Sequence, residues 1–109
     1  MTTTTPIPKL DDAHFDAEVI ESGVPVVVDF TAAWCAPCRV MDPVLAELAA
    51  ERDDVRFVKV DVDQNQATAA RYGVMSMPTF MVFKNGAPAA TLVGSRPKRK
   101  LAREIDEVI

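Results

Sequence analysis

The sequence contains little cysteine and histidine and has no excess of positive charge, and each shortage excludes a class of protein. Two cysteines among 109 residues are too few for a disulfide-rich secreted scaffold, which depends on several bridges. A closed zinc site needs four ligands, and His14 is the one histidine available to join the cysteines. The net charge of -4 argues against a nucleic-acid partner and against an anionic membrane, since both bind basic surfaces.

Long apolar runs are also missing. Asp29 interrupts the longest candidate, which starts at Val24, so no run approaches the roughly 18 apolar residues of a membrane-spanning helix. The first eight residues have neither the basic nor the apolar segment of a secretory signal, and we therefore expect a cytoplasmic protein. The length suits one domain, with 1–5 as a flexible threonine-rich tail and 6–109 as the folded part.

The most informative motif is the pair of cysteines, Cys35 and Cys38, separated by Ala36 and Pro37. Two thiols at this spacing, where a strand gives way to a helix, can close and reopen a disulfide at little conformational cost. A bridge between them closes so short a loop that its entropic stabilisation is small. Reversible dithiol chemistry is therefore favoured over a purely structural bridge.

The pattern of apolar residues predicts alternating strands and helices in one α/β domain. The stretch 24–30 is apolar on both faces, which is typical of a strand in the middle of a covered sheet. An Asn85–Gly86 pair between two short strands predicts a tight antiparallel turn. Further strands are expected at 7–10, 55–62, 79–83 and 89–93. Helices are expected from Asp11 or Asp12 to Ser22, over 38–50, over 63–72 with Asp63 as its cap, and from about Pro97 to the end.

Thiol–disulfide exchange requires a thiolate, so one cysteine needs a pKa below the free value of about 8.5. Cys35 is expected at the start of a helix, where the dipole alone lowers the pKa by less than about one unit. Backbone N–H groups of the first turn and the Cys38 thiol are the additional donors. Pro37 stiffens the spacer at a position where helices accept proline. Cys35 is thus the candidate nucleophile and Cys38 the resolving thiol.

Asp29 is an unusual residue for a central strand. Burial there would raise the pKa of its carboxyl group, because an unpaired carboxylate is costly away from water. If Asp29 lies beneath the start of the following helix, it is a candidate proton acceptor for Cys38. The alternative is an aspartate that faces solvent at a strand edge.

Taken together, several short motifs resemble those of the thioredoxin family, from about Asp11 to the C-terminus. The motifs are VDF at 28–30, WCAPC at 34–38, Pro43 in the following helix, DVDQN at 61–65, MPT at 77–79, FKNG at 83–86 and VG at 93–94. The resemblance implies a three-layer α/β sandwich, with a central mixed sheet flanked by helices and the dithiol exposed at a helix start.

The resemblance also implies how substrates bind. It implies a cis peptide bond before Pro78 next to the disulfide, and backbone hydrogen bonds from Met77 to an extended substrate. The implied apolar docking patch consists of Trp34, Ala36, Pro37, Met77, Val93 and Gly94. From composition alone, Met75, Met77 and Met81 would instead be interpreted as core or loop filler.

By the same resemblance, the protein reduces protein disulfides and is itself re-reduced by thioredoxin reductase, which draws on NADPH. It is expected to be a monomer with no bound cofactor and no metal. Two alternatives remain: an oxidant or isomerase on the same fold, and a module that binds a partner without redox turnover. A histidine between the cysteines would have favoured the oxidant, but Ala36 and Pro37 stand there.

The chain departs from the family pattern at three positions. Ala36 replaces a common glycine, Thr31 replaces an aromatic residue that usually lies under the active-site loop, and Ser76 replaces another glycine. The last predicted helix also has its basic residues first and its acidic residues last, against the helix dipole. This order fits either a solvated face or a docking site for an acidic partner.

Overall fold

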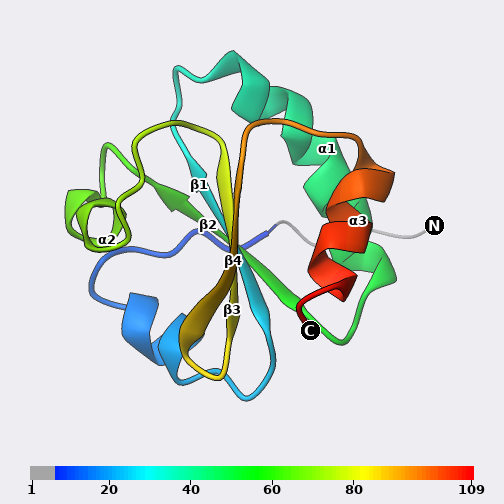
Figure 1. Cartoon of the computed structure of the whole chain (residues 1–109). Helices are drawn as coiled ribbons and strands as arrows, with labels where there is room; N and C mark the ends of the chain where they lie inside the picture. Colours follow the sequence, from blue (N-terminus) through cyan, green and yellow to red (C-terminus); the bar gives the residue numbers. More distant parts are fainter. Residues whose placement is uncertain (1–6) are drawn as a thin grey trace.

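A mixed four-stranded sheet lies at the centre of the protein, with helices on both faces (Figure 1). The computed structural model describes residues 7–109, so the predicted tail, 1–5, lies outside the described residues. The strand order is β2-β1-β3-β4, with β1 parallel to β2 and antiparallel to β3. The strands are β1 (Val26–Thr31), β2 (Arg56–Asp61), β3 (Thr79–Lys84) and β4 (Ala87–Val93). The helical elements are η1 (Asp16–Ile20), α1 (Ala36–Glu51), α2 (Gln66–Arg71) and α3 (Lys98–Asp106). This arrangement confirms the predicted fold class.

The two faces of the sheet carry separate apolar clusters. Helices α1 and α3 cover one face, while η1 and α2 lie on the other (Figure 1). In β1, Val27 packs under α1, whereas Val26 and Val28 contribute to the opposite cluster. Successive strand residues point to opposite faces, so Asp29 shares its face with Val27. The prediction that this strand is buried on both sides is confirmed.

The predicted edge strand at 7–10 is wrong as a strand. Only one bridge forms, between Lys9 and Lys59 of β2, supported by hydrogen bonds from Leu10 N to Lys59 O (2.8 Å) and from Lys59 N to Pro8 O (2.9 Å). Pro8 has no N–H to donate, which helps keep the pairing short.

The predicted helix from Asp11 or Asp12 to Ser22 is also shorter than expected. Only η1 forms, as a π-helix, after a turn in which Asp11 Oδ1 accepts from the backbone N–H of His14 at 2.9 Å. Asp12 instead accepts from the backbone and the hydroxyl of Thr68 in α2, at 2.9 and 2.5 Å. These long-range bonds draw the segment toward α2.

Two other local predictions have opposite outcomes. Asn85 and Gly86 have φ angles of 53° and 80°, as a two-residue hairpin requires, so the predicted turn is confirmed. Asp63 does not cap α2, because the residue at that position is Asn65. Among residues 7–109, no helix is long and apolar enough to cross a membrane.

The basic start of α3 is partly neutralised within the chain. Lys98 Nζ lies 2.8 Å from Glu51 Oε2 at the end of α1. Arg96 Nη1, just before the helix, lies 2.7 Å from Glu104 Oε2, and both of these side chains are largely buried. These pairs offset part of the unfavourable dipole interaction. Docking of an acidic partner at this end stays a prediction.

Candidate active site

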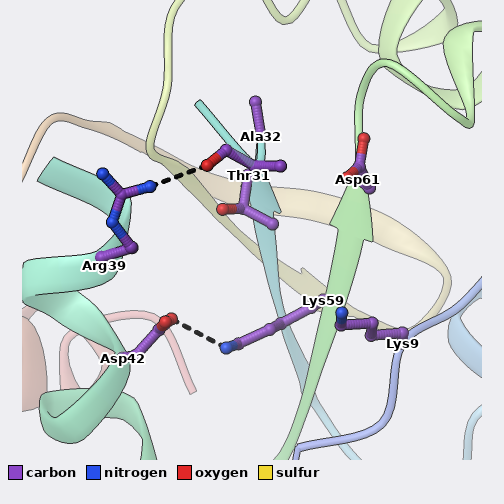
Figure 2. Close-up of a pocket in the computed structure, with 8 residues that line it drawn as sticks. Lys9, Thr31, Ala32, Arg39, Asp42, Lys59 and Asp61 are labelled. Carbon is purple, nitrogen blue, oxygen red and sulfur yellow. Dashed lines mark hydrogen bonds and ion pairs between the residues drawn. The ribbon is translucent and has the colours of Figure 1, made fainter. Parts of the chain in front are cut away.

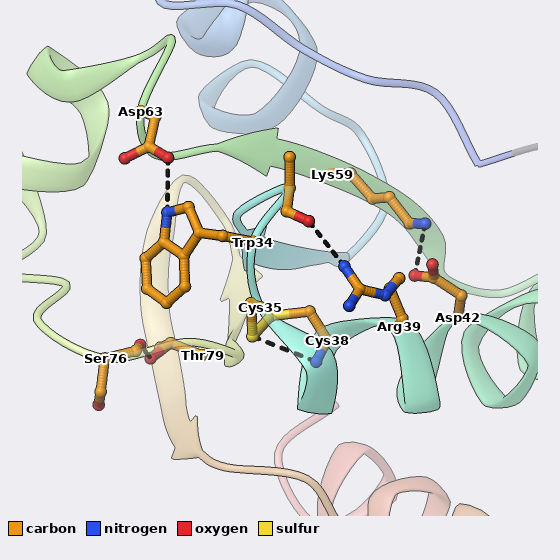
Figure 3. The surroundings of a disulfide bond; sticks show 10 residues. Trp34, Cys35, Cys38, Arg39, Asp42, Lys59, Asp63, Ser76 and Thr79 are labelled. Atoms are coloured by element: carbon orange, nitrogen blue, oxygen red, sulfur yellow. Dashed lines mark hydrogen bonds and ion pairs between the residues drawn. A yellow bond between two sulfur atoms is a disulfide. The ribbon is translucent and has the colours of Figure 1, made fainter.

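Helix α1 starts directly at the cysteine pair. Cys35 is the N-cap residue, with an extended backbone (φ -88°, ψ 105°), and Pro37 lies in the first turn. Cys35 and Cys38 form a disulfide with their Cα atoms 5.3 Å apart. The backbone N–H of Cys38 donates to Cys35 Sγ at 3.2 Å (Figure 3). The sequence predicts a helix that begins at about Cys38, but α1 begins two residues earlier, at Ala36. Cys35 therefore lies at the helix N-terminus, where the helix dipole and the N–H groups of the first turn favour a negative charge.

The cysteines are not exposed, contrary to the expectation from the family resemblance. Cys35 is 3% exposed and Cys38 is 1% exposed. They form a small buried cluster with Ala32, and Val62 and Met77 pack against it. The exposed surface around the disulfide instead comes from Ala36, Pro37 and Trp34. The sulfurs therefore lie beneath these side chains rather than on the surface.

Trp34 has a fixed partner that sequence analysis did not identify. Its indole Nε1 donates to Asp63 Oδ2 at 2.8 Å, while the residue itself is 65% exposed (Figure 3). Asp63 follows β2, so this bond joins the loop before α1 to the loop after β2. A large apolar ring is thus held at the surface beside the disulfide. The nearby DVDQN motif was a signal for this loop, but the pairing depends on the tertiary fold.

The segment before β3 lies against the cysteines as the resemblance implied. The Met77–Pro78 bond is cis, and Met77 packs on the cluster that contains Cys35 and Cys38. The backbone N–H of Gly94 donates to Pro78 O at 2.8 Å, which brings the 93–94 segment to the same place. Val93 is 57% exposed. Most of the predicted patch is therefore accessible, although Pro78 is buried and Met77 is half-buried.

The three methionines have different environments. Met81 is buried in the core, as the interpretation from composition had it, whereas Met75 is 92% exposed. Met77 lies between these extremes, against the disulfide.

Asp29 is 2% exposed, so the alternative of a solvent-facing aspartate is wrong. Among the described residues, neither of its carboxylate oxygens has a hydrogen-bond partner. Burial therefore raises the pKa of Asp29 to about 7; the charge of Lys59 lowers this pKa and the charge of Asp42 raises it, both to a smaller extent. Such a carboxyl group gains and loses a proton near neutral pH.

The topology places Asp29 and Cys38 on facing surfaces. The buried side of α1 consists of Cys38, Met41, Leu45 and Leu48, and this side packs on the face of the sheet that Asp29 shares with Val27. Asp29 lies near the end of β1 and Cys38 in the first turn of α1, and the two elements are joined there. Sequence analysis missed Lys59 and Asp42 as neighbours of Asp29. The position of Lys59 between the apolar residues of a strand was a signal for its role. No local sequence feature indicated that Asp42 lies near Asp29.

Cys35 and Cys38 close a disulfide at the start of a helix that packs on a mixed sheet, beside the cis-proline segment. Such a pair can alternate between the dithiol and the disulfide. This fold and site define a thiol–disulfide oxidoreductase. The family model described as "Thioredoxin" matches residues 6–107. The chain belongs to the thioredoxin family.

Curated relatives agree with this assignment. The chain is 51% identical to "Thioredoxin" of Staphylococcus aureus over 102 residues, which cover 93% of this chain and 96% of the relative. It is 48% identical to "Thioredoxin 1" of Synechococcus elongatus over 97 residues, 88% of this chain and 91% of the relative. It is 48% identical to "Thioredoxin" of Haemophilus influenzae over 101 residues, 92% and 94% of the two chains. Protein-disulfide reduction through a redox-active cysteine pair is therefore supported over the alternative functions.

The bond between Trp34 and Asp63 can be tested by fluorescence, because Trp34 is the only tryptophan. Replacement Asp63→Ala removes the acceptor, and we expect the indole to rotate more freely and the steady-state fluorescence anisotropy to fall. Asp63→Asn is the matched control, since its amide oxygen still accepts a hydrogen bond. Equal anisotropy in all three proteins would show that the bond does not orient the ring.

The buried carboxyl group of Asp29 predicts how stability depends on pH. A raised pKa means that, between about pH 4 and 7, the folded protein binds a proton that the unfolded chain has released. The folded protein therefore has its full stability with respect to Asp29 below about pH 4, and loses free energy of unfolding as the pH rises from 4 to 7. We expect Asp29→Asn to match the wild type at pH 4 and to exceed it at pH 8 by about 2–4 kcal/mol in free energy of unfolding.

Urea denaturation of the oxidised protein at several pH values measures this difference. The exposed Asp53→Asn serves as the control for removal of one negative charge, and its difference in free energy of unfolding from the wild type should be small. A stability gap for Asp29→Asn that is the same at pH 4 and pH 8 would argue against a buried titrating carboxylate.

Proposed function

We propose that this protein is a general reductase of protein disulfides in the cytoplasm, re-reduced by thioredoxin reductase with electrons from NADPH. The observation that carries the proposed mechanism is the hydrogen bond from the backbone N–H of Cys38 to Cys35 Sγ. A donor aimed at one sulfur stabilises the thiolate of that cysteine. Cys35 is accordingly the attacking thiol, and Cys38 resolves the intermediate.

The reaction proceeds in two exchange steps. The Cys35 thiolate attacks one sulfur of a substrate disulfide, so a Cys35–substrate bond forms, the substrate S–S bond breaks, and the other substrate sulfur leaves as a thiolate. Cys38 then gives its proton to Asp29 and attacks Cys35 Sγ. The Cys35–Cys38 disulfide forms and the second substrate thiolate leaves, so the substrate gains two electrons and the protein loses two. Thioredoxin reductase would reverse this oxidation.

The proposed substrate site is the patch named above. Trp34, held by Asp63, and exposed Val93 supply apolar contact area. Met77 lies against the disulfide, next to Pro78, and its backbone would pair with an extended substrate chain. Main-chain pairing reads no sequence by itself, which fits a reductase that accepts many proteins.

Replacement of the resolving thiol should trap the first intermediate. In Cys38→Ser, Cys35 still attacks, but nothing expels the substrate, so we expect a covalent complex with a disulfide-containing protein such as insulin. Non-reducing electrophoresis and mass spectrometry would detect it. Cys35→Ser is the matched control and should form no such complex. Steady turnover by Cys38→Ser would refute the assigned order of the two cysteines. A complex formed only by Cys35→Ser would reverse their roles.

The proposed electron source is tested by insulin reduction coupled to thioredoxin reductase and NADPH. We expect NADPH oxidation only when the reductase, this protein and insulin are all present. Equilibration with glutathione redox buffers separates a reductase from an oxidant, since a reductase has the lower potential. Failure of the reductase to restore the dithiol, while a small dithiol such as dithiothreitol still supports insulin reduction, would retain the exchange chemistry and remove the proposed partner.

A further inference from the structure

Lys59 lies beside Asp29 in the sheet but forms its ion pair with a residue of helix α1. In the parallel register of β1 and β2, Asp29 is opposite Lys59, and residues paired in this way lie on the same face. The Lys59 ammonium nitrogen is 2.7 Å from Asp42 Oδ1 (Figure 2). Both oxygens of Asp29 lack a partner among the described residues. The positive charge next to the buried carboxylate is thus held by a second carboxylate.

A cavity of about 200 Å³ lies beside this ion pair. Its charged lining residues come from three parts of the chain: Arg39 and Asp42 from α1, Lys59 and Asp61 from β2, and Lys9 from the segment before η1 (Figure 2). The Arg39 guanidinium donates to Ala33 O at 2.7 Å. On the other side of β1, β3 places the apolar Phe80 opposite Asp29. Thr31 also lines this cavity.

Asp42 can act on Asp29 in two ways. The negative charge of Asp42 disfavours a negative charge on Asp29. The ion pair of Asp42 also holds the Lys59 ammonium group, which would otherwise favour the ionised form of Asp29. Both effects favour the protonated form of Asp29. The Lys59 side chain is only 18% exposed, while that of Asp42 is 45% exposed, so the pair extends from the interior toward solvent. Without Asp42, the Lys59 ammonium group would lose its ion-pair partner, and Asp29 would be its neighbouring carboxylate.

We propose that Asp42 is a positioning residue, whose ion pair keeps the Lys59 ammonium group from neutralising Asp29 and thereby sets the pH range in which Asp29 accepts the proton of Cys38. This inference rests on the proton-acceptor role of Asp29 given above. Asp42 itself touches neither sulfur nor substrate in this arrangement. It acts through Lys59 of β2. Asp42 lies four residues beyond Cys38 on α1, and residues at this spacing lie on the same side of a helix.

The direct test is a carboxyl ¹³C NMR titration of Asp29 in the wild type and in Asp42→Asn. The substitution keeps the shape of the side chain and removes its charge. We expect the pKa of Asp29 to fall by about one unit, as an opposite charge nearby produces. Asp42→Glu, which restores a carboxylate, should return the pKa toward the wild-type value. Asp61→Asn is the matched control, because it removes a carboxylate from the same cavity wall, and it should leave the pKa of Asp29 nearly unchanged.

A second pair of variants shows whether Lys59 carries the effect. In a Lys59→Met background, Asp42→Asn removes only the direct repulsion, so we expect a clearly smaller fall in the pKa of Asp29. An unchanged pKa in Asp42→Asn would overturn the proposal. An equal fall with and without Lys59 would also overturn it, because Asp42 would then act by its own charge alone.

Kinetics separates this inference from the proposed function. A mixed disulfide of Cys35 with thionitrobenzoate releases a coloured thiolate when Cys38 attacks. At pH 6 we expect release to be about two- to fivefold faster in Asp42→Asn, because more of Asp29 is ionised. The midpoint of the pH–rate profile should move down together with the pKa from NMR. If the pKa moves but the profile does not, the proton-acceptor role of Asp29 is wrong, while the control of its charge by Asp42 stands.

Discussion

The packing of helix α1 on the sheet is the constraint on which the site depends. The helix begins immediately after Cys35 and buries Met41, Leu45 and Leu48 against the face of the sheet that also carries Asp29. Full burial of three such side chains contributes about 5–9 kcal/mol, more than the roughly 4 kcal/mol that an ionised Asp29 costs at neutral pH. Apolar packing can therefore hold an unpaired carboxylate under the active-site helix.

The same packing gives two acids opposite environments. The Cys35 sulfur lies at a helix N-terminus and receives a hydrogen bond from the backbone of Cys38, so its anion is stabilised. Asp29 receives no hydrogen bond from the described residues and is buried, so its neutral form is stabilised. A thiol that ionises readily and a carboxyl group that readily takes a proton are the two properties that sequential disulfide exchange requires. Lys59 and Asp42 then adjust the balance through one ion pair.

Much of this architecture could be predicted from the sequence, because it depends on local pattern. The apolar residues on both faces of the strand up to Phe30 indicated a central strand, and the Asn85–Gly86 pair indicated the hairpin between β3 and β4. The predictions failed where distant parts of the chain compete for the same groups. Asp12 hydrogen-bonds to Thr68 across the fold instead of capping a long helix, and Asp63 accepts a bond from Trp34 instead of capping α2.

The sequence by itself determined the cysteine pair and its spacing. It also determined that Asp29 lies in an apolar strand, away from water. Each of these features depends on residues within a few positions of one another. The tertiary structure decided the burial of both cysteines and the approach of Met77 to them. It also decided the partner of Lys59. The register of β1 and β2 and the packing of α1 on the sheet bring Asp29, Lys59 and Asp42 together from three elements. An electrostatic interaction between these residues exists only once those elements are packed.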